Sequence, residues 1–288
     1  MNDNPVLGVI GGTGLYKLPG LKNLESKGVD TPFGKPSSPV FLGELKGKTI
    51  AFIARHGIGH FISPSEVNYR ANIYAMKSLG INKVVGVSAC GSLRDDYSPG
   101  DLVIPDQLID FTKNRVYSFF GDGLVAHIGT ADPYCGSLST LAYQAVLSAG
   151  ATVHMGGAYI TIEGPRFSTK AESNLFRSWG LSVISMTNSP EAFLAREAEI
   201  CYTTIAHVTD YDVWHESEEP VSVEMILNTL QNNTKIVQRA LDILLDKITP
   251  EQECECANTL SNALVTRSDL IPDNTKNKLE LLIKKYTD

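Results

Sequence analysis

Long apolar runs and an excess of positive charge are both missing from this sequence. No uninterrupted apolar stretch approaches the roughly 20 residues that a membrane-spanning helix requires. The first residues, MNDNPVLGVIGG, lack the basic start and the small-residue cleavage site of a signal peptide. We therefore expect a cytoplasmic protein that does not bind a membrane. The net charge of −7 argues against nucleic acid as a partner, because a phosphate backbone requires a broad basic face.

Cysteine is scarce and follows no familiar framework. The five cysteines form neither the pattern of a secreted disulfide scaffold nor a Cys-x-x-Cys zinc set. Cys254 and Cys256 lie two residues apart in a polar C-terminal tail. They are either a redox-active or structural pair or two exposed free thiols, and we expect exposed free thiols. No metal site is predicted.

Standard nucleotide-binding and nucleophile motifs are also absent. Gly8–Gly14 is rich in glycine, but its spacing does not match the dinucleotide motif G-x-G-x-x-G. It is either a simple turn or a cradle for a small anion, to which Thr13 would add a hydroxyl. Gly43–Thr49 is one residue short of a P-loop and lies within a hairpin pattern. Ser88 lacks the G-x-S-x-G elbow of serine hydrolases, and no partner histidine can be assigned to Cys90.

What is present is the composition of an ordinary globular protein, with 43% hydrophobic and 20% charged residues. Strand-like and helix-like segments alternate, which predicts an α/β fold: a single domain with a mixed, mostly parallel central sheet flanked by helices. This domain covers residues 1–288, with a helical C-terminal extension from about residue 249. The expected strands are Val6–Ile10, Val40–Leu45, Thr49–Ala54, Lys83–Ala89, Ala158–Ile162, Ser182–Met186 and Ile200–Val208, and the expected helices are Val67–Leu79, Leu138–Ala149, Lys170–Trp179, Pro190–Glu199, Val221–Leu245 and Lys276–Tyr286.

Small hydroxyl, basic or acidic side chains lie at the ends of five of the expected strands, at the edge where α/β sheets bind ligands. They are Thr13, Arg55 with His56, Ser88, Thr187, and Asp210 with Asp212. An arginine fork beside an imidazole suits the oxygens of a phosphate. The two aspartates allow three interpretations: a metal site, a hydrogen-bonding pair for a ligand, or an ordinary polar turn.

Eight segments, in order and without large gaps between Val6 and Leu245, resemble the trimeric purine nucleoside phosphorylase family, and most closely its members that cleave methylthioadenosine. They are Ile10–Leu15, Asp30–Ser37, Ala54–Gly57, Ala89–Arg94, Thr161–Ser168, Met186-Thr187, Pro190-Glu191 and Thr209–Asp212. The resemblance implies a purine nucleoside phosphorylase-like fold and phosphorolysis. Inorganic phosphate, as co-substrate, attacks C1′ of the ribose, and adenine leaves without a metal or organic cofactor. The family forms homotrimers, sometimes paired into hexamers.

The resemblance also implies roles for individual residues. Met186 would pack under the ribose, Phe167 and Ser168 would border the base, and Val223 would lie beside the 5′ group. His127 would reach the 5′ pocket of a neighbouring subunit. Phosphate would be bound by Thr13, Arg55, His56, Ser88, the backbone of Ala89, and Thr187. Ser88 keeps a hydroxyl at a position where the family often has threonine.

The resemblance gives the two aspartates a catalytic role. A protonated Asp210 would donate to N7 of the leaving adenine, and Asp212 would support it or accept from the 6-amino group. Burial and a like-charged neighbour both favour a protonated carboxyl. Family members that act on 6-oxopurines carry asparagine where Asp210 stands, so methylthioadenosine is the expected substrate. The alternatives are a phosphorylase of methylthioinosine or another 6-oxopurine nucleoside, a metal-dependent hydrolase using His207 or His215, and a nucleoside-binding protein.

Overall fold

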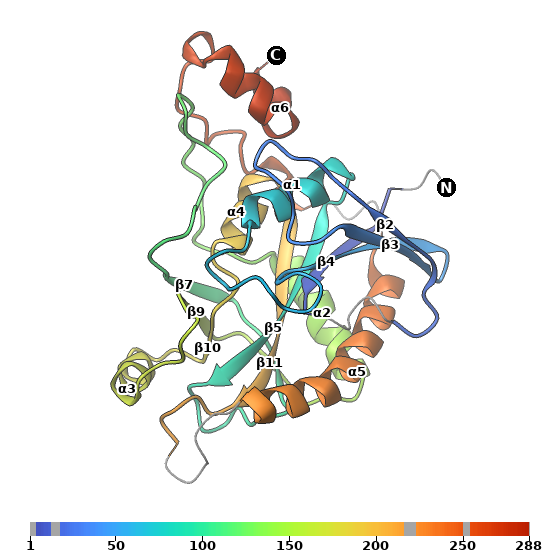
Figure 1. The fold of residues 1–288 in the computed structure, drawn as a ribbon, viewed down its shortest axis with the longest axis vertical. Helices are drawn as coiled ribbons and strands as arrows, with labels where there is room; N and C mark the ends of the chain where they lie inside the picture. The colour runs from blue at the N-terminus through green and yellow to red at the C-terminus, as the bar shows by residue number, and fades with distance from the viewer. Residues whose placement is uncertain (1–3, 13–17, 216–222, 250–253, 288) are drawn as a thin grey trace.

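The structure is a computed structural model that describes residues 4–12, 18–215, 223–249 and 254–287, with the backbone alone at 223–228 and 230–232. Its strands form one mixed sheet (Figure 1). Of the ten strand pairings in these residues, six are parallel, as the sequence predicts. The strands are β1 Leu7–Gly11, β2 Lys22–Lys27, β3 Val40–Leu45, β4 Lys48–Ala54, β5 Lys83–Ser92, β6 Leu102–Ile104, β7 Gln107–Phe111, β8 Val153–Met155, β9 Ala158–Ile162, β10 Val183–Ser185 and β11 Cys201–Asp210.

Helices cover both faces of this sheet (Figure 1). Alternate residues of β1 point to opposite faces, so Leu7 and Val9 join one part of the core and Ile10 joins the other. The first part contains α2 and α5, and the second contains α1 and α4. The helices are α1 Tyr69–Ser78, α2 Gly136–Ser148, α3 Lys170–Ser178, α4 Glu191–Glu197, α5 Val223–Lys247 and α6 Asp273–Thr287, with 3₁₀ turns at Glu255–Asn258 and Ser268–Leu270.

Every strand and helix expected from the sequence is present, with bounds shifted by a few residues. Pro190 is the N-cap of α4 and does not lie in its first turn. The β3–β4 hairpin turns at Lys46 and Gly47, both with positive φ, so the near P-loop is a hairpin as predicted. Strand β2 was not predicted because all six of its residues are exposed and its sequence, KNLESK, has no apolar alternation. Strands β6 and β8 are only three residues long.

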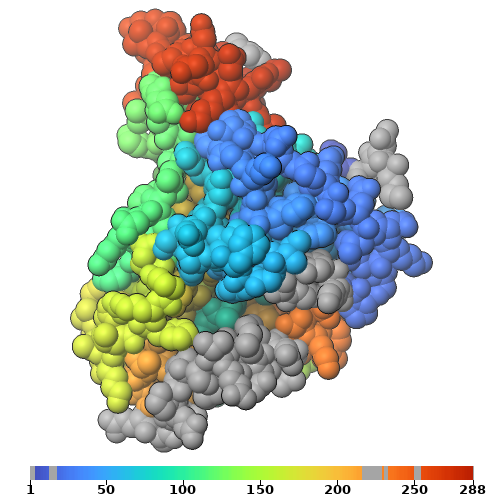
Figure 2. All heavy atoms as spheres, viewed as in Figure 1, coloured from blue at the N-terminus to red at the C-terminus, as the bar shows by residue number. Residues whose placement is uncertain are grey.

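The chain beyond residue 254 packs against the loop that contains Asp122 (Figure 2). The hydroxyl of Thr275 donates to the Asp122 carbonyl at 2.6 Å, and Lys278 lies 2.9 Å from the Asp122 carboxylate. Leu279 is buried in the same part of the core as α1. In the part of the chain that the structure describes, no helix is long and apolar enough to cross a membrane.

The cysteine prediction is partly wrong. None of the five cysteines forms a disulfide in the structure, and the redox state of Cys254 and Cys256 stays a prediction. Cys256, however, is buried and Cys254 is half-buried, so neither thiol is exposed in the way the polar tail suggested. The reason is tertiary: the segment that carries them folds back onto Cys135 at the start of α2.

Candidate functional site

The central strand β5 changes its neighbour on one side. Its residues Val84–Gly86 pair with β1 in parallel, whereas Gly91 and Ser92 pair with β10 in antiparallel. Between these two pairings, β11 is the only strand among the described residues that pairs with β5. Beside this gap lies a cavity of about 960 Å³. The position matches the rule that α/β sheets bind ligands where neighbouring strands lead in different directions.

Ten of the thirteen residues predicted for the site line this one cavity. They are Arg55, His56, Ser88, Ala89, Phe167, Ser168, Met186, Thr187, Asp210 and Asp212. Thr13 and the side chain of Val223 lie outside the described residues. His127 is exposed and does not line the cavity. Its expected role concerns a neighbouring subunit and stays a prediction.

One side of the cavity presents groups suited to an anion. The Ser88 hydroxyl is buried and has no hydrogen-bond partner among the described residues. Nδ1 of His56 lies 3.0 Å from the carbonyl oxygen of Ile62. Burial, with the positive charge of Arg55, lowers the pKa of His56 to about 4, so its ring is neutral. Nδ1 therefore carries the hydrogen and donates to Ile62, which leaves Nε2 as an acceptor.

Contrary to the expectation from the sequence, the guanidinium of Arg55 is not free to bind a phosphate with all of its N–H groups. It is buried and donates to both oxygens of Glu191, at 2.8 and 2.7 Å. It also donates to the carbonyls of Val87 and Ile10, at 2.9 and 3.0 Å. Four of its five N–H groups are thus committed, and the second N–H of Nη1 has no acceptor among the described residues, so it is available to a ligand. Sequence reasoning assigned no role to Glu191, although Pro190-Glu191 is one of the segments of the resemblance.

The other side of the cavity carries the two aspartates. Asp210 accepts from the Thr209 hydroxyl at 2.6 Å and from the backbone N–H of Asp212 at 2.8 Å. The Oδ2 atom of Asp212 is buried without a partner among the described residues. Burial raises the pKa of both carboxyls, and the charge of Asp210 adds to the effect at Asp212. The Asp210 side chain lies so close to the backbone of Gly91 that a Cβ on Gly91 would be 2.8 Å from Oδ1 of Asp210.

The aspartates do not form a metal site with the nearby histidines. In the described parts of the chain, the one cluster of potential ligands close enough to hold a metal ion consists of cysteines elsewhere. His207 lines the cavity, and burial lowers its pKa to about 4. Cys90 also lines it, but burial raises the pKa of its thiol, which makes it a poor nucleophile. The geometry favours a hydrogen-bonding carboxyl pair among the three interpretations.

Comparison with known proteins identifies the family. The Phosphorylase superfamily matches residues 6–246. The S-methyl-5′-thioadenosine phosphorylase of Geobacter sulfurreducens is 52% identical over 282 residues, covering 98% of this chain and 99% of that protein. The enzyme of the same name from Koribacter versatilis is 48% identical, covering 97% of this chain and 96% of that protein. A crystal structure of methylthioadenosine phosphorylase from an antarctic soil metagenomic library has a TM-score of 0.93 at 45% identity, covering 97% of this chain and 99% of that one. The chain therefore belongs to the Phosphorylase superfamily and, within it, to the family of S-methyl-5′-thioadenosine phosphorylases.

Proposed function

We propose that the protein catalyses phosphorolysis of S-methyl-5′-thioadenosine to adenine and 5-methylthioribose 1-phosphate. The observation that carries this proposal is the pairing, in one cavity, of a buried Ser88 hydroxyl that has no hydrogen-bond partner among the described residues with the carboxyls of buried Asp210 and half-buried Asp212. The first group suits a phosphate and the second suits the polar edge of a purine. The names of relatives that match nearly the whole chain support the same reaction.

The reaction requires a general acid next to the purine. A phosphate oxygen forms a bond to C1′ as the C1′–N9 bond breaks, and the electron pair of that bond moves into the purine. Asp210 delivers its proton to N7, so adenine leaves neutral and Asp210 becomes a carboxylate. Burial of Asp210 favours the protonated form that this step consumes. Asp212, whose Oδ2 has no partner among the described residues, accepts from the 6-amino group.

The phosphate side supplies donors and one acceptor. Ser88 and Thr187 donate through their hydroxyls, Ala89 through its backbone N–H, and Arg55 through its remaining Nη1 hydrogen. The acceptor is Nε2 of neutral His56, which suits the protonated oxygen of monohydrogen phosphate. Thr13, which lies outside the described residues, is the remaining member of the proposed set.

The nucleoside occupies the rest of the cavity. Met186 packs under the ribose, and Phe167 and Ser168 border the base. Val223, whose side chain lies outside the described residues, is the residue proposed to face the methylthio group. An apolar contact of this size favours methylthioadenosine over adenosine by about 1–3 kcal/mol. Phe61 lines the cavity yet is 73% exposed, which fits a mouth that a neighbouring subunit covers. The proposed assembly is a homotrimer or a dimer of trimers in which the neighbour's copy of His127 reaches this mouth.

The reaction as proposed needs no metal and no organic cofactor, because proton transfer at N7 neutralises the leaving base and phosphate is the nucleophile. In the cell, the reaction belongs to purine and methionine salvage in the cytoplasm.

The test is purine release from methylthioadenosine, adenosine, inosine and methylthioinosine, each with and without phosphate. We expect adenine to appear only with phosphate, and fastest from methylthioadenosine. Faster release of hypoxanthine would refute the role given to the two aspartates. Release without phosphate would make the protein a hydrolase and would refute phosphorolysis.

A further inference from the structure

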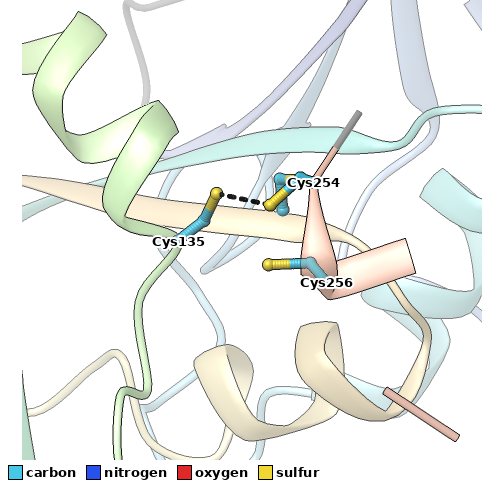
Figure 3. Close-up of side chains that lie close together, drawn as sticks. Cys135, Cys254 and Cys256 are labelled. Carbon is cyan, nitrogen blue, oxygen red and sulfur yellow. Dashed lines mark hydrogen bonds between the residues drawn. The ribbon is translucent and has the colours of Figure 1, made fainter. Parts of the chain in front are cut away.

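Four of the five cysteines converge at a point that the proposed reaction does not use. Cys135 is the N-cap of α2, Cys201 is the first residue of β11, and Cys254 and Cys256 flank Glu255 at the 3₁₀ turn after α5. Their four sulfur atoms all lie within 4.8 Å of one another. Figure 3 shows the side chains of Cys135, Cys254 and Cys256 directed toward one another, with Cys135 and Cys254 3.3 Å apart at sulfur.

The arrangement has the dimensions of a tetrathiolate metal centre. A tetrahedral zinc ion binds four cysteine sulfurs at about 2.3 Å, which places the sulfurs about 3.8 Å from one another. Four sulfurs within 4.8 Å of one another are close to that geometry before any metal is bound. A disulfide would instead require two of them to approach to about 2.05 Å. Soft thiolate ligands in a tetrahedral set select zinc over magnesium, calcium or manganese.

The surroundings of the cluster suit its charge. Four thiolates around one Zn²⁺ carry a net charge of −2, which needs nearby donors. Nη1 of Arg196 lies 3.1 Å from the sulfur of Cys256, and the Ser137 hydroxyl lies 3.2 Å from that of Cys135. The N-terminal end of α2, at Cys135, adds the positive end of a helix dipole. Cys135, Cys201 and Cys256 are also buried in the apolar core, which protects such a centre from solvent.

We propose that Cys135, Cys201, Cys254 and Cys256 bind one Zn²⁺ ion as a structural tetrathiolate centre. On binding, the four thiols release four protons and form four Zn–S bonds, and no redox step is involved. The ion joins three separate segments of the chain. It fixes the C-terminal segment onto the start of β11, the strand that carries Asp210 at its other end.

The first test measures zinc in the full-length protein, purified with a reductant and without chelators. We expect about one zinc per chain by elemental analysis, and loss of at least nine tenths of it in Cys201→Ser and in Cys256→Ser. Cys90→Ser is the matched control, because Cys90 is also buried but is not part of the cluster. It should retain the zinc. A wild-type protein without zinc, or variants that keep it, would overturn the proposal.

The second test needs no variant, so it holds even if a serine substitution prevents folding. Metal-free wild-type protein is titrated with Co²⁺, and the expected result is the intense visible spectrum of tetrahedral cobalt thiolate, saturating at one equivalent and reversed by zinc. Thiols are then counted after denaturation without reductant. Five thiols per chain agree with the proposal. A count of one, from two disulfides among the four cysteines, together with no cobalt spectrum, would refute it. Both tests are independent of the proposed enzymatic activity.

Discussion

Replacing Asp210 by asparagine would remove the proposed acid while preserving the shape of its side chain. The hydrogen bonds around Asp210 explain why the fold should tolerate the change. The amide oxygen can accept from the backbone N–H of Asp212, as Oδ1 does now at 2.8 Å. The amide nitrogen can donate to the Thr209 hydroxyl, which already has a second acceptor in the Cys90 carbonyl at 3.2 Å. We therefore expect a stability change below about 1 kcal/mol.

The kinetic effect of Asp210→Asn should be much larger than its effect on stability. A positioned general acid contributes a factor of about 10²–10⁴ in rate, which corresponds to about 3–5 kcal/mol of the activation barrier. The kcat for adenine release from methylthioadenosine should fall by that factor, with a smaller change in KM. The kcat for hypoxanthine release from methylthioinosine should fall less, because an amide side chain suits the edge of a 6-oxopurine. The variant should therefore prefer methylthioadenosine over methylthioinosine less strongly than the wild type does.

Steady-state purine release across a range of pH is the assay. Burial raises the pKa of Asp210, and the protonated form is the proposed donor. In the wild type, kcat should therefore fall as pH rises through that raised pKa, and Asp210→Asn should lack this decline. Asp269→Asn, at a mostly exposed aspartate in the C-terminal segment, is the matched control and should behave as wild type. A folded Asp210→Asn protein with a kcat within twofold of wild type would remove Asp210 from the mechanism.

Three further predictions concern single side chains. Ser88→Ala removes a hydrogen bond to a charged ligand, worth about 1.5–3 kcal/mol, so the KM for phosphate should rise about 10–100-fold while the KM for the nucleoside stays near wild type; equal changes in both would contradict its placement. Glu191→Gln leaves the buried Arg55 charge without its carboxylate, at a cost of about 3–5 kcal/mol, and thermal melting should move down by about 5–8 °C for 288 residues. Burial raises the pKa of Glu197 from 4.5 to about 7, so its contribution to stability is complete below pH 4.5 and is lost as pH rises through 7. The free energy of unfolding measured with urea should fall by about 3 kcal/mol between pH 4.5 and pH 7. The Glu197→Gln variant should lack this pH dependence. If the variant keeps the pH dependence of the wild type, Glu197 titrates normally in the folded protein.

Much of the site could be predicted because it depends on local pattern. Ser88 and Asp210 follow runs of buried apolar residues, and side chains at such positions reach the edge of a sheet where ligands bind. The partner of Arg55 could not be predicted in this way, since Glu191 lies 136 residues further along the chain. The same limit applies to the cysteine cluster. The sequence shows Cys254 and Cys256 as neighbours, but only the fold brings Cys135 and Cys201 to them.

Both sides of the proposed site depend on one pair of strands. In the β5–β11 ladder, Ser88 is opposite Ala206 and Gly91 is opposite Asp210. Ser88 and Gly91 are three residues apart on β5, or roughly 10 Å along an extended strand, so a sugar and a base fit between the phosphate donor and the acid. An irregularity in β11 between Val208 and Asp210 sets this register. Without it, Thr209 would stand opposite Gly91, and the Asp210 carboxylate would lose its place beside a residue that has no Cβ to exclude it. The irregularity in β11 and Gly91 in β5 thus act together to place the acid, Asp210, at a fixed distance from the anion site.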